Sequence, residues 1–332
     1  ISGKNSFAQD VIVASATKPV EKEEKIITEG DLTAAEEEDE KEPTFMLSGS
    51  LDTYFRTSFN TQNAYFNDSF APSTSFANQH GFGLGMFNLI ATYSGEKVGF
   101  TGDLVFGPRG RDAVFGTATN QGIINQAFVF YKVAEKFTLN LGQFNTFLGH
   151  EVISPTGNFH YSTSYLFSWG PFNHTGVRLD FAGENGVVAK FAVMNPTDFV
   201  EFNPVNTYTL GGQIGKTSDK GGIWFNLLYG DLDGTLDDDA VALATSKGSL
   251  FQADLTLGYN LTDKFYLGFN ASSQSLAPGE EVDINGDIID STKDPSSFFG
   301  FAIYPKLTFS EKFALGLRAE YFSVKNGHLS IF

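Results

Sequence analysis

The sequence contains no cysteine, no long apolar run and few basic residues for its length. Without cysteine, the chain cannot form a disulfide scaffold or a thiolate metal site. No stretch approaches the roughly 18 consecutive apolar residues that a transmembrane helix needs, so a membrane-spanning structure would have to be built from strands. The 22 Lys and Arg residues against 39 Asp and Glu give a net charge of −17, which argues against a general nucleic-acid binder because phosphate contacts need clustered cations.

Aromatic residues and glycine are abundant instead. The 332 residues include 35 Phe, 12 Tyr and 35 Gly, and 41% of the chain is hydrophobic, yet the mean hydropathy is close to zero. This combination indicates aromatic, strand-forming segments diluted by polar residues, which is unusual for a soluble α/β enzyme.

The first residues differ from the rest of the chain. Residues 1–8 do not begin with Met and could be the remnant of a signal-peptide cleavage region. Residues 9–43 carry the acidic run Glu36–Glu40 and almost no aromatic residues, so we expect a flexible periplasmic leader, with a short solvated helix over 31–42 as the alternative. We expect a barrel over 44–332, truncated at its C-terminus because residues 329–332 begin a strand without room to finish.

From Phe45 onward, apolar and polar residues alternate over segments of roughly ten residues that end in turn-forming residues, the pattern of transmembrane β-strands. Arg318 and Glu320 lie on one face of such a segment and Leu317 on the other. A shift of one residue would place both charges in lipid, where Arg costs roughly 2–4 kcal/mol at mid-depth. Residues 251–259 and 265–271 repeat the pattern, whereas 123–133 is ambiguous because Phe128 and Phe130 share a face with polar residues.

Connections between these segments alternate strictly in length. Short turns are predicted near Gly95, Glu135, Glu184, Asp219, Thr262 and Glu311, and long connections near Asn67, Arg111, Pro155, Pro204, Asp238 and Ile288. Short periplasmic turns and long external loops are typical of outer-membrane barrels. The sequence therefore predicts an all-β, transmembrane antiparallel up-and-down β-barrel with about thirteen strands and the start of a fourteenth, and 14 or 16 strands in the full protein because bacterial barrels close with an even number.

Two acidic segments resemble sites of known chemistry. Residues 231–236 match the nucleophile motif of haloacid-dehalogenase-like phosphatases, but that chemistry needs a buried parallel strand and a following helix, which the surrounding pattern does not provide. Asp283, Asn285 and Asp287 are weak calcium candidates, because their oxygen spacing lacks the bidentate Glu of an EF-hand. A plain solvated loop, or a contact with lipopolysaccharide bridged by divalent cations, is the alternative.

Catalytic and metal-binding patterns are otherwise missing. The five histidines are not at metal-ligand spacing, and no Ser and His stand out as a lipase pair. We therefore expect no enzymatic activity, no catalytic residue and no cofactor.

Charged residues on the predicted inner face are candidates for lining a pore. A packed soluble core would not tolerate so many charges, whereas a hydrated lumen does, and there they would set ion preference. Mutually paired charges that brace a closed lumen are the alternative. The predicted pore-lining residues are Asp52, Arg56, Asp103, Arg178, Asp180, Lys190, Arg318 and Glu320.

The third long loop, residues 147–175, is rich in aromatic and polar residues. A loop of this length is usually functional, and the third loop of general porins folds inward, so we expect a constriction here. A loop that caps the outside is the alternative. The candidate constriction residues are Glu151, Asn158, His160, Tyr161, Tyr165, Trp169 and His174.

One family shares the features of this region. The chain resembles the putative β-barrel porin-2 (OmpL-like) family of Gram-negative bacteria over Phe45 to Phe332, at residues 142–144, Glu151, Asn158, 161–162, 164–165 and the run Pro171–Arg178. The resemblance implies a barrel in the cell outer membrane with porin activity. The long acidic leader and the missing final strands depart from the family pattern.

These observations predict a porin-like outer-membrane channel for passive diffusion of small hydrophilic solutes or ions. The alternative is a surface receptor or adhesin scaffold with a plugged lumen. The expected partners are outer-membrane lipid and lipopolysaccharide, small solutes and no nucleic acid, and the protein could form a homo-oligomer. A TonB-dependent transporter is disfavoured, because those barrels have about 22 strands and a folded plug domain.

Overall fold

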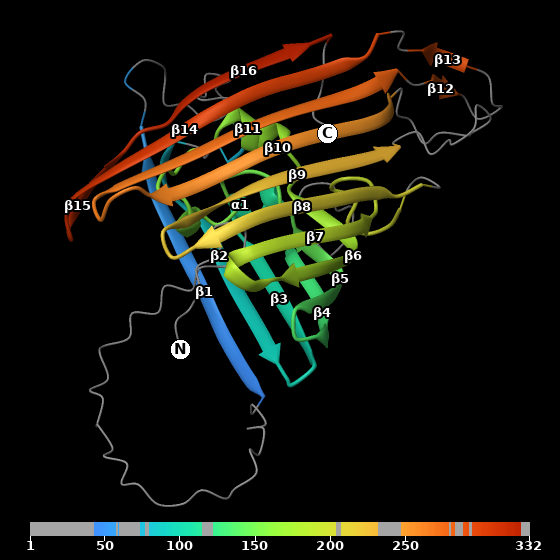
Figure 1. Ribbon diagram of the computed structural model, residues 1–332. Coiled ribbons are helices and arrows are strands. Elements are labelled where there is room, and N and C mark those ends of the chain that lie inside the picture. The colour runs from blue at the N-terminus through green and yellow to red at the C-terminus, as the bar shows by residue number, and fades with distance from the viewer. Residues whose placement is uncertain are drawn as a thin grey trace, which may run out of the picture.

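A computed structural model describes residues 43–57, 59, 74–76, 80–114, 122–203, 207–231, 247–278, 280–282, 288–291 and 294–326 (Figure 1). The expected signal-peptide remnant, the acidic leader up to residue 42, the calcium candidates and the strand expected to start at Leu329 lie outside these residues. None of the described helices is long and apolar enough to span a membrane.

Almost every described element is a β-strand. Two short α-helices, α1 (Pro108–Ala113) and α2 (Tyr165–Trp169), and two 3-10 turns, η1 (Pro155–Gly157) and η2 (Glu184–Gly186), lie between strands. The strands are β1 (Thr44–Arg56), β2 (Gly81–Ser94), β3 (Val98–Phe106), β4 (Ile124–Ala134), β5 (Phe137–Asn145), β6 (Asn173–Ala182), β7 (Val187–Met194), β8 (Thr209–Ser218), β9 (Gly221–Asp231), β10 (Lys247–Asn260), β11 (Phe265–Pro278), β12 (Glu280–Val282), β13 (Ile288–Ser291), β14 (Ser296–Ser310), β15 (Phe313–Gly316) and β16 (Ala319–Lys325).

Fourteen strands form one antiparallel sheet in which each strand pairs with its neighbours in the chain. β12 and β13 form a separate two-stranded hairpin between β11 and β14. Both β15 and β16 pair with β14, because Gly316 faces Lys306 and Glu320 faces Ala302. β15 and β16 therefore follow one another along the same edge of β14, and are called the β15–β16 line below. The predicted all-β, up-and-down antiparallel class is confirmed.

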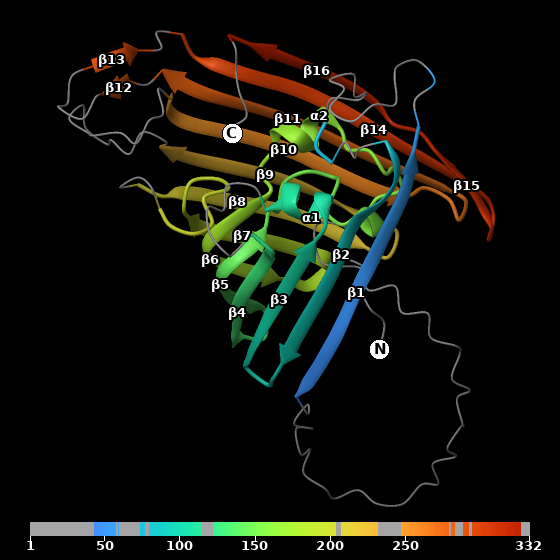
Figure 2. The same cartoon turned by 180° about the vertical axis from the view of Figure 1, so that it is seen from behind.

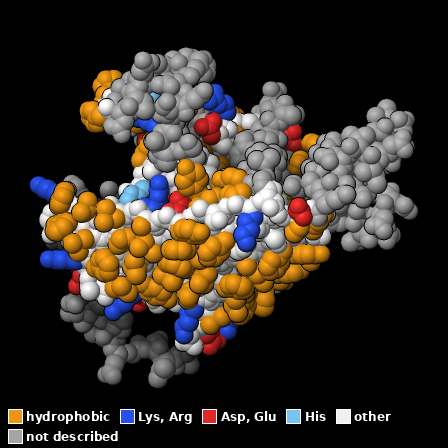
Figure 3. All heavy atoms as spheres, turned by 90° about the horizontal axis from the view of Figure 1, so that it is seen from above, with side chains coloured by type: hydrophobic (Ala, Val, Ile, Leu, Met, Phe, Trp, Pro, Cys, Tyr) orange, Lys and Arg blue, Asp and Glu red, His pale blue; other side chains and the backbone are white. Residues whose placement is uncertain are grey.

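Side chains alternate between an exposed outer face and a buried inner face. In β14, Phe299, Phe301 and Ile303 are exposed, whereas Phe298 and Tyr304 are buried on the other face. The outer wall of the sheet is covered by hydrophobic side chains (Figure 3). The inner face carries mainly amides, hydroxyls and charges, so the alternation predicted from the sequence is the alternation of the folded chain.

The pairing of β4 shows which of its two faces points inward. Phe130 lies opposite Gly99 of β3, and a Cβ atom built on Gly99 would lie 2.1 Å from the Phe130 ring. Gly99 thus leaves the space that an inward-facing ring needs. Periodicity could not assign the face of Phe130, because the partner that makes room for it lies on another strand.

Turns at one end of the sheet are short, as predicted near Gly95, Glu135, Glu184, Asp219, Thr262 and Glu311. The described connections at the other end are longer and include α1 and the segment 146–172 between β5 and β6. The sheet curves strongly, and α1 and α2 lie within its concave side (Figure 2). Among the described residues, β1 and the β15–β16 line each pair on one side only, so the sheet is open between them.

Candidate functional site

The segment 146–172, here called the inner loop, lies against the inner face of the sheet. Gly149 donates its backbone N–H to Asp254 of β10 at 3.2 Å, and the Phe147 carbonyl accepts a hydrogen bond from Gln213 of β8 at 3.0 Å. The Tyr161 hydroxyl donates to Asp52 of β1 at 2.7 Å. These bonds join the loop to strands that lie far apart in the sheet, so the loop crosses the concave side.

Apolar packing fixes the beginning of the inner loop. Phe147 and Leu148 are buried with inward residues of five strands, and Phe128 packs against the same cluster. The buried strand residues of this layer are Phe144, Ala192, Met194, Leu228, Leu250 and Leu276. Side chains therefore fill one part of the lumen beside the loop.

Two residues after β15 hold the rest of the loop. Arg318 donates to the Glu151 carboxylate at 2.8 Å and to the Ser162 carbonyl and hydroxyl. The Glu320 carboxylate accepts the backbone N–H groups of Tyr165 and Leu166 at 3.0 and 2.8 Å. These are the first N–H groups of α2, which have no partner within the helix. Together with the Tyr161–Asp52 bond, these contacts connect the two open edges of the sheet through the loop.

Arg109 of α1 supports the loop from the other side. Its side chain is fully buried, donates to the carbonyls of Ile153 and Tyr161 at 2.8 and 3.1 Å, and lies 4.2 Å from the centre of the Phe76 ring. Burial lowers the pKa of Arg109 to about 10, so the guanidinium is still charged at neutral pH. A buried cation that bonds two loop carbonyls limits how far the loop can move.

The end of the inner loop is held by Asp198, in the connection between β7 and β8. Its carboxylate accepts the backbone N–H groups of Phe172 and Asn173 at 2.8 and 2.7 Å. Asp198 is 5% exposed, and this burial raises its pKa to about 7. Its backbone is left-handed, with a φ of 65°, which Asp and Asn adopt more readily than most residues.

We expect an Asp198→Asn variant to be more stable than the parent at pH 8, by up to about 4 kcal/mol, and equally stable at pH 4. In the unfolded chain this carboxyl loses its proton near pH 4, whereas the folded protein keeps it to about pH 7. The folded state binds more protons in this window, so the free energy of unfolding falls as the pH rises through it. The amide keeps an acceptor oxygen and has no such proton to lose.

Urea unfolding of vesicle-refolded protein at the two pH values measures this difference. Asp219→Asn, which makes the same chemical change in the exposed turn after β8, is the matched control. An Asp198→Asn variant that differs from the parent by the same amount at pH 4 and pH 8 would contradict the prediction.

All eight predicted pore-lining residues have inward positions in the strand alternation, but many of them are engaged. Arg178 forms an ion pair with Asp180 at 2.8 Å. Asp103 accepts hydrogen bonds from the amides of Asn88, Asn125 and Gln126 and is 2% exposed. Asp52, Arg318 and Glu320 hold the inner loop, and Arg56 and Lys190 also have interactions within the described part of the protein.

The predicted constriction residues have different surroundings. The Asn158 side chain accepts the backbone N–H of Val152 and donates to the Val152 carbonyl. These two bonds fix the conformation of the loop between the two residues. Tyr165 stacks on Phe322, and Trp169 packs against Phe298 and Phe322. His174 lies in β6 rather than in the loop, and its buried ring bonds Thr146 at 2.9 Å. Glu151 and His160 line a cavity on the short-turn side of the loop.

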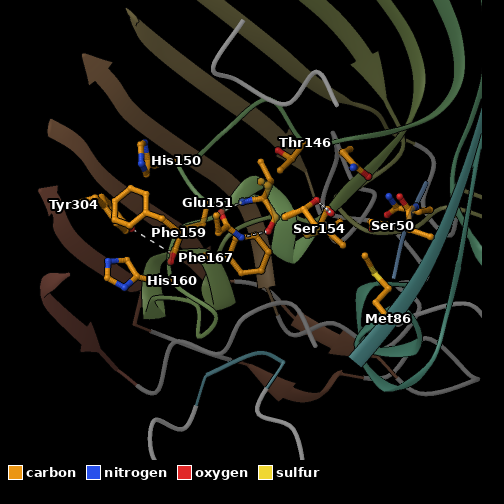
Figure 4. A pocket seen from close by; sticks show the side chains of 18 of the residues that line it. Ser50, Met86, Thr146, His150, Glu151, Ser154, Phe159, His160, Phe167 and Tyr304 are labelled. Carbon is orange, nitrogen blue, oxygen red and sulfur yellow. Dashed lines mark hydrogen bonds between the residues drawn. The ribbon is translucent and has the colours of Figure 1, made fainter. Parts of the chain in front are cut away.

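This cavity, about 640 Å³ in volume, lies between the inner loop and residues of β1 to β5, β10, β11 and β14 (Figure 4). Four buried polar atoms on its lining have no hydrogen-bond partner among the described residues: Ser50 Oγ, Asn125 Oδ1, Asn145 Oδ1 and His160 Nε2. Buried polar groups without a protein partner need water or a solute as a partner. The lining is therefore that of a hydrated space.

His150 forms part of the cavity wall beside Tyr304, with ring centres 4.4 Å apart. Burial lowers the pKa of His150 to about 4, so its ring is neutral at neutral pH. Sequence reasoning singled out charged residues and missed uncharged lining residues such as Ser50, Asn125 and Tyr304. Their inward places in the strand alternation are the signal that could have identified them.

Other candidate sites have less support. No group of three His, Cys, Asp or Glu residues that could hold a metal ion occurs in the part of the chain that the structure describes. Asp231 ends β9, which pairs antiparallel with β8 and β10, whereas the dehalogenase motif requires a parallel strand. Asp283, Asn285 and Asp287 lie outside the described residues.

Among solved structures, this chain is similar to two forms of an outer-membrane protein and to a porin, all at low identity. OmpTdeltaL8, a loop L8 deletion mutant of OmpT from Vibrio cholerae, is 9% identical with a TM-score of 0.35, over 86% of this chain and 95% of that one. The in-vitro folded trimer form of V. cholerae OmpT is 10% identical with a TM-score of 0.35, over 85% and 89%. A triple mutant of the Rh. blastica porin is 14% identical with a TM-score of 0.34, over 84% and 100%.

No curated protein matches the chain. A family model does match, over residues 44–331, which is nearly the whole region for which the sequence predicts a barrel. The chain therefore belongs to the family described as putative beta-barrel porin-2, OmpL-like, and is an outer-membrane β-barrel protein of porin type.

Proposed function

We propose that the protein is a passive channel for small hydrophilic solutes or ions in the outer membrane of a Gram-negative bacterium. The observation that carries this proposal is the polar cavity in the lumen, whose buried Ser50, Asn125, Asn145 and His160 atoms need water as partners. The inner loop would narrow the path, and no catalytic step or cofactor is part of the proposal. The hydrophobic outer wall would contact lipid, and the long connections at the other end would face lipopolysaccharide.

In this proposal, the inward charges act mainly through the inner loop. Arg318, Glu320 and Asp52 hold the loop in the lumen, and the path runs beside it. Solutes would then meet a wall of amides and hydroxyls, because the carboxylates of Asp103 and Glu151 are already bonded. Size and hydrogen bonding would select solutes more than charge does.

A surface receptor or adhesin scaffold with a plugged lumen is the second candidate. The apolar layer around Phe147 and Leu148 favours it, because these side chains fill part of the lumen beside the inner loop. The braced inward charges also agree with a closed interior. The two candidates differ in whether water and ions pass the loop.

Planar-bilayer recording of the full chain tests the proposal. We expect stable current steps that become smaller in a Ser50→Trp variant, because Ser50 lines the cavity and its hydroxyl has no partner to lose among the described residues. Ser275→Trp, at an exposed position of β11, is the matched control and should leave the steps unchanged. Absence of current from protein shown to be folded and inserted would reject the channel and favour the plugged scaffold.

A further inference from the structure

The cavity on the short-turn side of the inner loop has two chemically different walls. One is the aromatic wall, formed by His150, Phe159, His160, Tyr266 and Tyr304, whose labelled members gather together in Figure 4. Phe159 stands edge-on to Tyr266, with ring centres 6.1 Å apart, and is 37% exposed. An aromatic ring with an accessible face is a platform for the apolar face of a bound solute.

The other is the polar wall, formed by Ser50, Asn125 and Asn145. Asn125 donates its amide N–H to Asp103 at 2.7 Å, which fixes the orientation of the amide, and its oxygen is an acceptor without a partner among the described residues. Ser50 Oγ and Asn145 Oδ1 are also buried without a partner among the described residues. The two amide oxygens can only accept hydrogen bonds, whereas the Ser50 hydroxyl can donate or accept. The amide oxygens therefore need donors, which hydroxyl groups supply and ionised carboxylate and phosphate oxygens do not.

Charge on the cavity lining is nearly balanced. Glu151 is paired with Arg318, and the carboxylates of Asp103 and Asp263 are matched in number by the ammonium groups of Lys264 and Lys306. Asp263 and Lys264 are neighbours in the short turn, and the Lys306 ammonium lies 5.6 Å from the centre of the Phe159 ring. Neither a strong cation site nor a strong anion site results, which favours an uncharged solute.

We propose that this cavity is a binding site for small neutral sugars, whose ring faces stack on Phe159 while their hydroxyl groups donate to the polar wall. The inference rests on the proposed channel and goes further by assigning its solute class. A volume of about 640 Å³ is within the ordinary range of small-molecule sites and has room for a mono- or disaccharide. The aromatic wall supplies stacking and the polar wall supplies orientation.

Three solutes of similar size, compared in bilayer recordings of the full chain, test whether the cavity prefers a ring and an uncharged solute. Glucose has hydroxyl groups and a rigid ring with apolar faces, sorbitol has hydroxyl groups on an open chain, and gluconate has an open chain with a negative charge. We expect glucose to reduce the current in a saturable manner, and sorbitol and gluconate to do so at higher concentration. Equal effects of all three solutes would overturn the proposal.

Substitutions on each wall have matched controls. Phe159→Leu keeps an apolar side chain and removes the ring, and Ser50→Ala removes a hydroxyl that has no described partner. Each should raise the glucose concentration that halves the current by about 3- to 10-fold. Phe299→Leu and Ser275→Ala make the same changes on the exposed outer face and should have no effect. Unaltered glucose block in both cavity variants would contradict the proposed site.

Ligand-observed NMR on the refolded protein with the same three solutes measures sugar binding without requiring that the protein conducts. Current without any preference for glucose would overturn the sugar site and leave the channel. Selective glucose binding that Phe159→Leu weakens, in protein that carries no current, would support the sugar site in a plugged barrel. Loss of both current and glucose binding in folded protein would reject both proposals.

Discussion

An Arg318→Met variant is expected to lose about 3 kcal/mol of unfolding free energy and to carry larger, noisier currents than the parent. The side chains of Arg318 and Glu151 are only 14% and 4% exposed, and their ion pair measures 2.8 Å. Removing the cation leaves the Glu151 carboxylate buried without its charged partner. It also removes both bonds to Ser162, so that of the bonds named above only those of Glu320 still hold the inner loop to the edge formed by β15 and β16.

Urea unfolding in vesicles and single-channel recording measure the two effects. The Glu151→Gln, Arg318→Met double variant should recover most of the lost stability, because no buried charge is then left unpaired. Arg111→Met, at an arginine whose side chain is 80% exposed, is the control and should be close to neutral. If Arg318→Met had the stability and current noise of the parent, the inner loop would not depend on this contact.

A Phe301→Arg variant is expected to insert poorly into bilayers and to lose roughly 2–4 kcal/mol of stability. Phe301 lies on the exposed face of β14, near the middle of that strand, where it stacks on Tyr321 with ring centres 5.7 Å apart. A guanidinium at this depth would meet hydrocarbon and no partner.

Phe309→Arg makes the same chemical change on the same face of the same strand, close to the turn after β14. The expected cost there is about 0–1 kcal/mol, because a charge near the interface reaches water. Unfolding free energies of the two variants in vesicles give the depth dependence directly. Equal costs at the two positions would contradict a lipid-facing outer wall.

The pairing of the inward charges has a consequence for how the protein would select solutes. In an open pore, the charges on the wall set the ion preference. Here Arg178 is paired with Asp180, and Arg318 with Glu151. Neutralising any of them would first change how the lumen is held together, and only then the current. Uncharged lining residues such as Ser50 are the cleaner probes of permeation.

The sequence by itself determined which way most of the strands face, with β4 as the exception. A period of two is a local property, so Arg318 and Glu320 had to lie inward once Leu317 and Tyr321 were assigned to lipid. The short turns followed from the same local pattern, because a hairpin closes within a few residues. The antiparallel order of the sheet then required only that consecutive strands pair.

Only the tertiary structure decided what the inward side chains do. Arg318 and Glu151 are 167 positions apart, and Gly149 and Asp254 are 105 apart. Such contacts depend on the curvature of the sheet and on the path of the inner loop across it, neither of which leaves a local periodic signal. For the same reason, the unpaired polar atoms of the cavity became visible only when the loop was in place, because a polar group lacks a partner only relative to everything folded around it.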